Sequence, residues 1–304
     1  MHRAFALTGV LALAAGSFGL ALAAGSFGSS LNGQGRRVDL EATAECPGNY
    51  MSGDFEVARA TQRASVPISA GTLDVRPDFN GGVRVERGPG GAYGVVACIM
   101  AGAPTRAEAQ AAVDSIRLEI EGSRVRVRDN GARGRINNWS VQLVVTAPDG
   151  ASIAAETSNG PIGVTDFTGT LDLRASNGPI SMQGVSGDVK AHASNGPITV
   201  EGSRGEFDVQ TANGPISVRL DGRRWDGHLT ARASNGPLTL SVPSDYESGV
   251  EISSSAHSPW SCRATACRGG NRDWDDRSRI LRIGTDPVVV RLSTVNGPVT
   301  VHDR

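Results

Sequence analysis

The sequence predicts an all-β protein, a single-stranded β-helix (a solenoid) whose coils of about 18 residues stack along one axis. Three observations predict it. One short motif recurs at a fixed spacing, apolar and polar residues alternate between its copies, and the composition is rich in glycine and poor in aromatic residues. The 304 residues include 39 glycines and only 5% aromatics, which is typical of short strands joined by tight turns.

The recurring motif is SNGPI, which begins at Ser158, Ser176 and Ser194. Near-copies are ANGPI at 212–216, SNGPL at 234–238 and VNGPV at 295–299. The motif asparagines are Asn159, Asn177, Asn195, Asn213, Asn235 and Asn296. The first four follow one another at a constant interval, and the interval to the fifth is longer because of an insertion between Leu220 and Gly227. A fixed period of this kind is typical of stacked repeats.

Aligning the copies on asparagine reveals columns of like residues. The third residue after each asparagine is apolar in Ile162, Ile180, Ile198, Ile216 and Leu238, whereas the residues midway between copies include the polar Asp172, Lys190 and Asp208. This alternation with a period of two predicts two short strands per unit. Stacking the units about 4.8 Å apart would pair each strand with its copies. By analogy with parallel crossovers, we expect a right-handed coil.

The motif itself is interpreted as a corner of the coil. Stacked asparagine amides can form a hydrogen-bonded ladder along the axis. Glycine permits backbone angles that are closed to other residues. Proline lacks an N–H group and suits the point where the strand ladder turns. Each coil needs one such corner, which explains the repetition.

The repeat region is assigned to 151–304. The interval from Asn235 to Asn296 is much longer than one repeat, and we interpret 253–278 as a loop inserted into a late coil. A strand pattern resumes at 280–283 and 288–292.

The region 71–150 is interpreted as degenerate early coils and an N-terminal cap. Leu73, Val75 and the segment 80–85 keep the motif offsets, with glycine in place of proline. The capping box from Thr105 to Glu108 predicts a short helix over 106–115. Residues 24–70 form an N-terminal extension that we expect to be partly irregular.

The segment 1–23 resembles a signal peptide. Arg3 gives a positive start, an apolar run follows, and Ala21 to Ala23 has the small-x-small form of a cleavage site. Cleavage is expected near Ala23 and Ala24. A retained membrane anchor is the alternative, although glycines interrupt the run. We find no second apolar run long enough to span a membrane, and expect export to the periplasm, cell surface or medium.

Export makes disulfides possible for the four cysteines, Cys46, Cys98, Cys262 and Cys267. Four thiols allow three pairings. We favour Cys262 with Cys267, which are close in sequence, and Cys46 with Cys98, which would staple the N-terminal region. Zinc is the alternative, but the CxxxxC spacing is unusual for a zinc site and no histidine lies at a suitable distance. We predict no metal and no cofactor.

These motifs resemble those of a bacterial family of putative adhesins of unknown function built from β-strand repeats. The resemblance rests on the NGPI-type repeats, the final TVNGPVTV at 294–301 and the helix-then-strands segment before the repeats, and it covers about 73–301. It implies a β-helix and an exported, envelope-associated protein. The cysteine-bearing insertion and Cys46 depart from the pattern, and no functional residue is transferred.

The sequence offers little sign of catalysis. A formal net charge of −1 gives no reason to expect nucleic acid as a partner. Enzymes that cleave acidic polysaccharides need clustered carboxylates, whereas Asp172, Lys190 and Asp208 alternate in charge, as stacked neighbours require. His192 lies in an outward column and is interpreted as surface. Asp273, Asp275 and Asp276 could hold a cation, but flanking arginines favour a salt-bridged loop.

Three tryptophans are the candidates for contact with a ligand or partner, namely Trp225, Trp260 and Trp274. An exposed tryptophan beside arginine can stack on a sugar or anchor a protein. The alternative is that these rings cover the flank of the stack. A flat face that could meet a polymer or another protein is the column of small hydroxyl residues Ser181, Thr199, Ser217 and Thr239. The alternative is that serine and threonine simply suit exposed strands.

The sequence therefore predicts an exported, non-catalytic β-helix that binds or scaffolds in the bacterial cell envelope, with an envelope protein or glycan as partner. Two alternatives stay open. One is a periplasmic partner in envelope-stress signalling, and the other is a polysaccharide-active enzyme.

Overall fold

A computed structural model describes residues 37–38, 46, 51–52, 55–77, 81–130 and 138–304. The signal segment 1–23 lies outside the described residues. So does most of the N-terminal part of the extension, 24–54. The chain divides into two compact units, 1–35 and 36–304, and all described residues belong to the second. The described residues of that unit are all-β apart from α1 (Arg106–Ser115) and two short 3₁₀ turns, η1 (Ile68–Ala70) and η3 (Thr265–Arg268). Among the described helices, none has the length and apolar character needed to cross a membrane.

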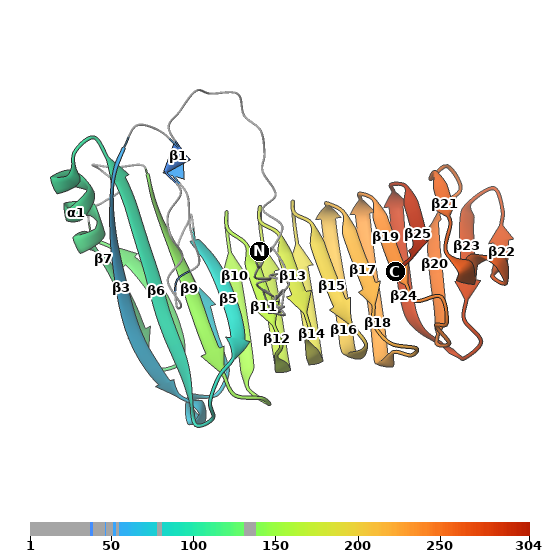
Figure 1. Ribbon diagram of the computed structural model, residues 1–304, viewed down its shortest axis with the longest axis horizontal. Coiled ribbons are helices and arrows are strands. Elements are labelled where there is room, and N and C mark those ends of the chain that lie inside the picture. Colours follow the sequence, from blue (N-terminus) through green and yellow to red (C-terminus); the bar gives the residue numbers. More distant parts are fainter. Residues whose placement is uncertain (1–36, 39–45, 47–50, 53–54, 78–80, 131–137) are drawn as a thin grey trace, which may run out of the picture. The chain divides into compact units, whose positions relative to one another are not determined.

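Most strands belong to two large sheets (Figure 1). The twelve-stranded sheet contains, in spatial order, β22 (Asn271–Trp274), β23 (Ser278–Ile283), β20 (Gly249–Ser255), β24 (Val288–Asn296), β18 (Asp226–Asn235), β16 (Arg204–Asn213), β14 (Ser186–Ala193), β12 (Thr168–Ala175), β10 (Ser152–Thr157), β4 (Leu73–Arg76), β8 (Arg124–Asp129) and β7 (Ile116–Glu121).

The eleven-stranded sheet contains β21 (Trp260–Cys262), β25 (Val299–Asp303), β19 (Leu238–Val242), β17 (Ile216–Leu220), β15 (Ile198–Gly202), β13 (Ile180–Gln183), β11 (Ile162–Thr165), β5 (Gly81–Arg87), β9 (Trp139–Ala147), β6 (Ala92–Ala103) and β3 (Glu56–Pro67). Strands β1 (Arg37–Val38) and β2 (Met51–Ser52) form a separate two-stranded sheet.

Between β10 and β19 the chain alternates between the two sheets, and neighbouring strands pair in parallel with the register of the repeat. Leu171 pairs with Val189 and Ile180 with Ile198, and in each pair the partner is the equivalent residue of the next repeat. The early segment joins the same register, since Val83 pairs with Ile162. Neither sheet closes on itself.

The inward columns of both sheets form one hydrophobic core. Along β12 and β13, Leu171, Leu173, Ile180 and Met182 are at most 1% exposed. Because burial of one such side chain contributes about 1.5–3 kcal/mol, the repeated columns stabilise every coil in the same way.

The motif asparagines form one hydrogen-bonded ladder along a corner of the stack. Each Nδ2 donates to the Oδ1 of the preceding copy, at 2.9–3.1 Å, from Asn177 to Asn159 up to Asn296 to Asn235. The proline carbonyls of the same corners accept backbone N–H groups, as in Ile180 N to Pro197 O at 2.9 Å.

The motif glycines have a different role from the one expected. Among the described residues the backbone angle φ is positive at Gly187, Gly205 and Gly227 in the second turn, but not at any motif glycine. A Cβ atom on Gly178 would instead lie 2.0 Å from the carbonyl oxygen of Gly160. The motif requires glycine because successive corners touch, so the conformational explanation is wrong there.

The segment expected to be a loop at 253–278 is a structured cap. The chain leaves the stack after β19 and forms β20 to β23, and then β24 and β25 return between the coil β18–β19 and the cap. Asn296 therefore stacks on Asn235 despite their distance in the sequence. His257 to Trp260 is a degenerate corner, because Trp260 pairs with Val299 and Pro259 O accepts Val299 N at 2.8 Å.

The N-terminal end is built in the same way. The coil β4–β5 lies between β10–β11 and the later β8–β9. Helix α1, which begins at the predicted Thr105 capping box, buries Ala109, Ala112 and Val113 against the core. The Gln62 side chain joins the two sheets, because its Nε2 donates to Ile116 O and its Oε1 accepts Leu118 N, both at 2.8 Å.

Candidate binding surfaces

The C-terminal cap carries a half-exposed tryptophan, Trp274, beside the side chains of Arg279 and Trp260. We call these three residues, together with Ser254, the platform. Trp274 on β22 pairs with Arg279 on β23, which pairs with Ser254 on β20. The Arg279 guanidinium lies 5.1 Å from the Trp274 ring centroid. The Trp260 ring lies 6.2 Å from the same ring, and its Nε1 donates to Ser254 Oγ at 2.7 Å. Trp274 is 50% exposed, so part of its surface remains available to a ligand.

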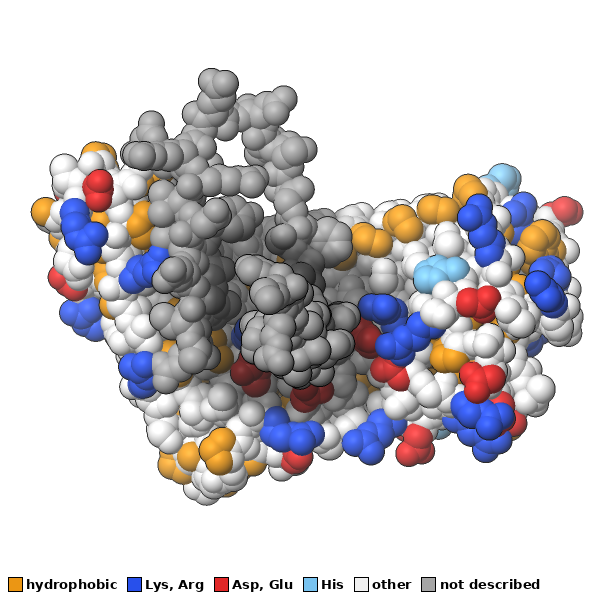
Figure 2. All heavy atoms as spheres, in the orientation of Figure 1, with side chains coloured by type: hydrophobic (Ala, Val, Ile, Leu, Met, Phe, Trp, Pro, Cys, Tyr) orange, Lys and Arg blue, Asp and Glu red, His pale blue; other side chains and the backbone are white. Residues whose placement is uncertain are grey.

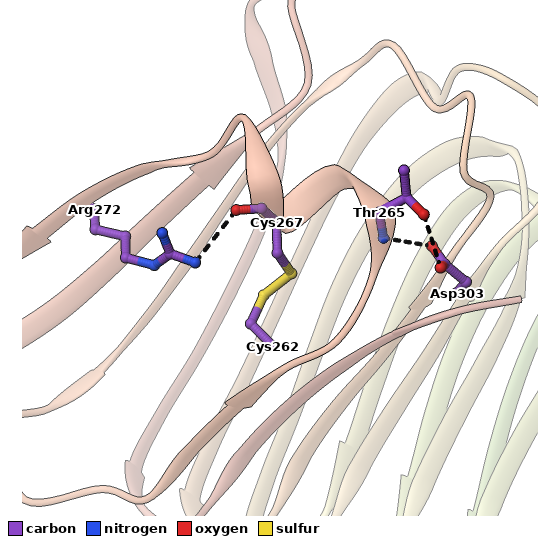
Figure 3. The surroundings of a disulfide bond; sticks show 5 residues. All are labelled: Cys262, Thr265, Cys267, Arg272 and Asp303. Atoms are coloured by element: carbon purple, nitrogen blue, oxygen red, sulfur yellow. Dashed lines mark hydrogen bonds between the residues drawn. A yellow bond between two sulfur atoms is a disulfide. The ribbon is translucent and has the colours of Figure 1, made fainter.

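The cap is fastened at several points (Figure 3). A disulfide joins Cys262 on β21 to Cys267 in η3. Arg272 Nη2 donates to the Cys267 carbonyl oxygen at 3.3 Å. The Asp303 carboxylate accepts Thr265 N at 2.8 Å and Thr265 Oγ1 at 3.0 Å. These contacts hold the loop after β21 against β25, so the platform rests on a fixed support.

The acidic stretch beside Trp274 is a turn. Asp275 Oδ1 accepts the backbone N–H groups of Arg277 and Ser278, both at 2.7 Å. These backbone hydrogen bonds lower the pKa of Asp275. The part of the chain that the structure describes holds no group of three His, Cys, Asp or Glu side chains arranged for a metal ion.

Trp225 does not belong to this surface, and its assignment as a contact residue is wrong. Its side chain is 4% exposed and packs edge-on against Phe207, with ring centroids 5.5 Å apart. Its Nε1 donates to Gly205 O at 3.0 Å, and its backbone N–H donates to Ser248 Oγ at 3.1 Å. The insertion that carries Trp225 therefore contacts the first residues of the segment that leaves the repeats after β19. We call this segment, 247–286, the C-terminal excursion.

Salt bridges join the same insertion to the excursion. Arg224 Nε lies 2.7 Å from Glu247 Oε2 and 3.4 Å from Asp286 Oδ2, and Arg223 also pairs with Glu247. The bond to Arg224 lowers the pKa of Glu247. Since Glu247 and Asp286 lie at the start and end of the excursion, these contacts fix its base.

The outer face of the twelve-stranded sheet is polar and mixed in charge. Asp172, Lys190 and Asp208 are direct neighbours in register on β12, β14 and β16. A depression of about 450 Å³ follows the glycines of the second turn, including Gly187, Gly205 and Gly227. A smaller one of about 240 Å³ lies around Lys190.

The outer face of the eleven-stranded sheet carries the predicted hydroxyl column. Ser181, Thr199, Ser217 and Thr239 pair in sequence, and Thr300 and Ser261 continue the column. Figure 2, which views one face of the molecule, shows charged side chains of both signs interspersed over the C-terminal half. Neither this hydroxyl column nor the charged column on the other sheet forms a large apolar patch.

Two disulfides link the four cysteines in the favoured pairing. Cys46 bonds to Cys98 on β6, and Cys262 to Cys267. The sequence did not indicate the roles of Arg279 and Ser254, because it gave no sign of β22, the strand that pairs with β23 in the hairpin. The one available signal was the polar and apolar alternation from Ser278 to Ile283.

No protein-family profile and no curated protein sequence matches this chain. Solved structures similar to it include a putative cell adhesion protein from Clostridium sporogenes, with 10% identity, a TM-score of 0.34, and coverage of 81% of this chain and 100% of that one. A putative adhesin from Bacteroides fragilis has 9% identity, a TM-score of 0.33, and coverage of 81% and 97%. A putative lipid binding protein from Parabacteroides distasonis has 8% identity, a TM-score of 0.32, and coverage of 81% and 96%.

Proposed function

We propose that this chain is an exported, non-catalytic binding module of the bacterial cell envelope, of the kind the putative-adhesin resemblance implies. Its contact surface is the C-terminal cap. The observation that carries the proposal is the half-exposed Trp274, held by Arg279 and Trp260 on a cap fastened by a disulfide. A rigid aromatic ring of this kind binds sugars or protein side chains at low entropic cost.

Export is supported by the signal-like segment 1–23 and by two disulfides, which persist in oxidising compartments. The mature protein would act in the periplasm or at the cell surface, on an envelope protein or glycan. We further infer that the two sheets together make a right-handed β-helix, supported by the alternation of strands between sheets and the parallel register.

The test compares Trp274→Ala with Val295→Ala in the full mature chain. Val295 is 57% exposed on the stack, so it controls for loss of an exposed apolar side chain. Labelled protein is titrated onto envelope fractions and a glycan panel. We expect Trp274→Ala to weaken binding about tenfold, a loss of about 1.4 kcal/mol, and Val295→Ala to leave it unchanged. Equal binding by both variants would reject the cap as the contact surface.

The signalling alternative predicts a different result in the same material. Crosslinking in intact cells followed by purification would then recover a membrane sensor, in place of attachment to isolated envelope glycan. A point substitution is preferable to deletion of 253–278, because that segment covers the last coil of the stack.

A further inference from the structure

A second polar site lies on the outer face of the twelve-stranded sheet, several strands away from the cap. It is the depression of about 240 Å³ at the centre of β12, β14 and β16. Its lining is rich in groups that donate or accept hydrogen bonds, and comprises Asp172, Arg174, Lys190, His192, Asp208 and Gln210.

Both carboxylates of this site already have cationic partners. Arg174 Nη2 lies 2.7 Å from Asp172 Oδ2. Arg232 Nη1 lies 3.2 Å from Asp208 Oδ1, which also accepts Gln210 Nε2 at 3.1 Å. Each carboxylate has a second oxygen that can still accept a ligand hydroxyl.

Lys190 is the third cation of this group, beside Arg174 and Arg232. It lies between Asp172 and Asp208 in register, is exposed, and has no ion pair among the described residues. Since Arg174 pairs with Asp172 and Arg232 pairs with Asp208, the ammonium of Lys190 can pair with an external anion. His192 lies two residues further along the same face of β14.

Lys190 is also the single lysine of the chain, since the other basic residues among the 30 Lys and Arg are arginines. The two side chains are not interchangeable. Arginine at this position could fork onto the neighbouring carboxylates, whereas the compact ammonium of lysine keeps three donors that can turn to an external anion.

We propose that this depression binds a uronate unit of an acidic polysaccharide, with the sugar carboxylate at Lys190. The sugar hydroxyls donate to Asp172 and Asp208 and accept from Gln210 and His192. Because strands repeat about every 4.8 Å, the polymer continues over neighbouring coils. The proposal rests on the proposed binding role and names its ligand class, but it uses a surface separate from Trp274.

The single lysine allows a direct measurement. The mature chain is acetylated with an amine-reactive ester, and the modification of Lys190 is followed by mass spectrometry of its peptide, apart from the terminal amine. Oligogalacturonate is the probe, and its methyl ester is the uncharged control. We expect oligogalacturonate to slow acetylation of Lys190 about tenfold and the methyl ester to leave it unchanged. Equal rates with and without oligogalacturonate would overturn the proposal.

Variants separate this site from the cap. Lys190→Gln should abolish binding of oligogalacturonate, Lys190→Arg should retain part of it, and Arg219→Gln on the other sheet should not change it.

If Trp274→Ala loses envelope binding while Lys190 stays protected, both proposals hold; if Trp274→Ala changes nothing, only the cap is rejected. Equal protection by polyphosphate would show mere charge attraction and overturn uronate recognition. Shortened oligouronate products would support the site and overturn the non-catalytic role.

Discussion

Replacing Gly196 with alanine tests whether the coils touch at their glycine corners. The new Cβ would lie 2.1 Å from the carbonyl oxygen of Gly178, whereas Cβ contacts essentially never fall below 3.0 Å, so the corner must move by about 1 Å. The movement would strain three bonds that cross the corner, namely Asn195 Nδ2 to Asn177 Oδ1 at 3.0 Å, Asn195 N to Ser176 O at 2.8 Å and Ile180 N to Pro197 O at 2.9 Å.

At about 1 kcal/mol net for each bond, the loss is about 3 kcal/mol. Alanine recovers about 0.4–1 kcal/mol by restricting the unfolded chain, so the free energy of unfolding should fall by roughly 2–3 kcal/mol. In a domain of this size that corresponds to a decrease in Tm of about 4–12 °C.

The matched control is Gly163→Ala. Gly163 lies on the outer face of β11, its φ is not positive, and a Cβ atom there would meet nothing within 4 Å. That substitution should be neutral or stabilise by up to about 1 kcal/mol. Urea unfolding followed by circular dichroism gives both values. If Gly196→Ala costs no more than Gly163→Ala, the glycines are not kept by contact between coils.

Other predictions concern the disulfides, the strand order and a buried phenol. In the chain-entropy model, replacing Cys46 and Cys98, which are 52 apart in sequence, should cost about 4 kcal/mol, and replacing Cys262 and Cys267, 5 apart, about 2 kcal/mol; the reverse order of urea midpoints would contradict this. Thr230→Cys with Arg291→Cys should form a disulfide, whereas Thr230→Cys with Glu251→Cys should not, because β24 separates the second pair by about 10 Å; gel mobility under oxidation decides between them. Burial raises the pKa of Tyr246 to about 12. The unfolded chain therefore loses its phenolic proton first, and stability should fall by about 2–3 kcal/mol as the pH rises from 10 to 12; Tyr246→Phe should remove this decrease, and an unchanged pH profile would refute it.

The repeat region could be predicted because its inward columns contain apolar residues and its corner column contains asparagine. Ile162, Ile180 and Ile198 share an offset from their asparagines, and this fixes both the strand and the side that faces the core. The asparagine offset likewise places the amides of Asn177 and Asn195 within hydrogen-bonding distance. Periodicity carries this information because parallel strands in register place equivalent residues side by side.

The caps could not be predicted in the same way, because their contacts depend on pairings without a period. Nothing local in the sequence indicates that β24 lies between β18 and β20, or that the backbone N–H of Trp225 donates to Ser248 Oγ. The first strand of the β22–β23 hairpin, β22, is largely polar and exposed throughout, so it lacks the apolar alternation that marks a strand. The platform around Trp274 depends on this hairpin and was accessible only from the structure.

The last two strands, β24 and β25, lie between β18–β19 and the cap, and the corners give a physical reason for this order. A coil with a complete NGP corner presents an asparagine amide, a glycine without Cβ and an open strand edge, which together can receive another coil. Asn296 and Gly297 belong to such a coil, and they are enclosed between β18–β19 and the cap. The outermost corner has His257 and Ser258 in place of asparagine and glycine. At the motif glycines a Cβ would meet the corner of the preceding repeat, as at Gly297, where it would lie 2.0 Å from the carbonyl oxygen of Gly236. Ser258 therefore prevents the outermost corner from approaching Gly297 as closely as the complete corners approach one another. By placing the complete copy inside and the degenerate copy outside, the chain ends the described amide ladder at Asn296, and the outermost corner offers no asparagine amide to a further copy.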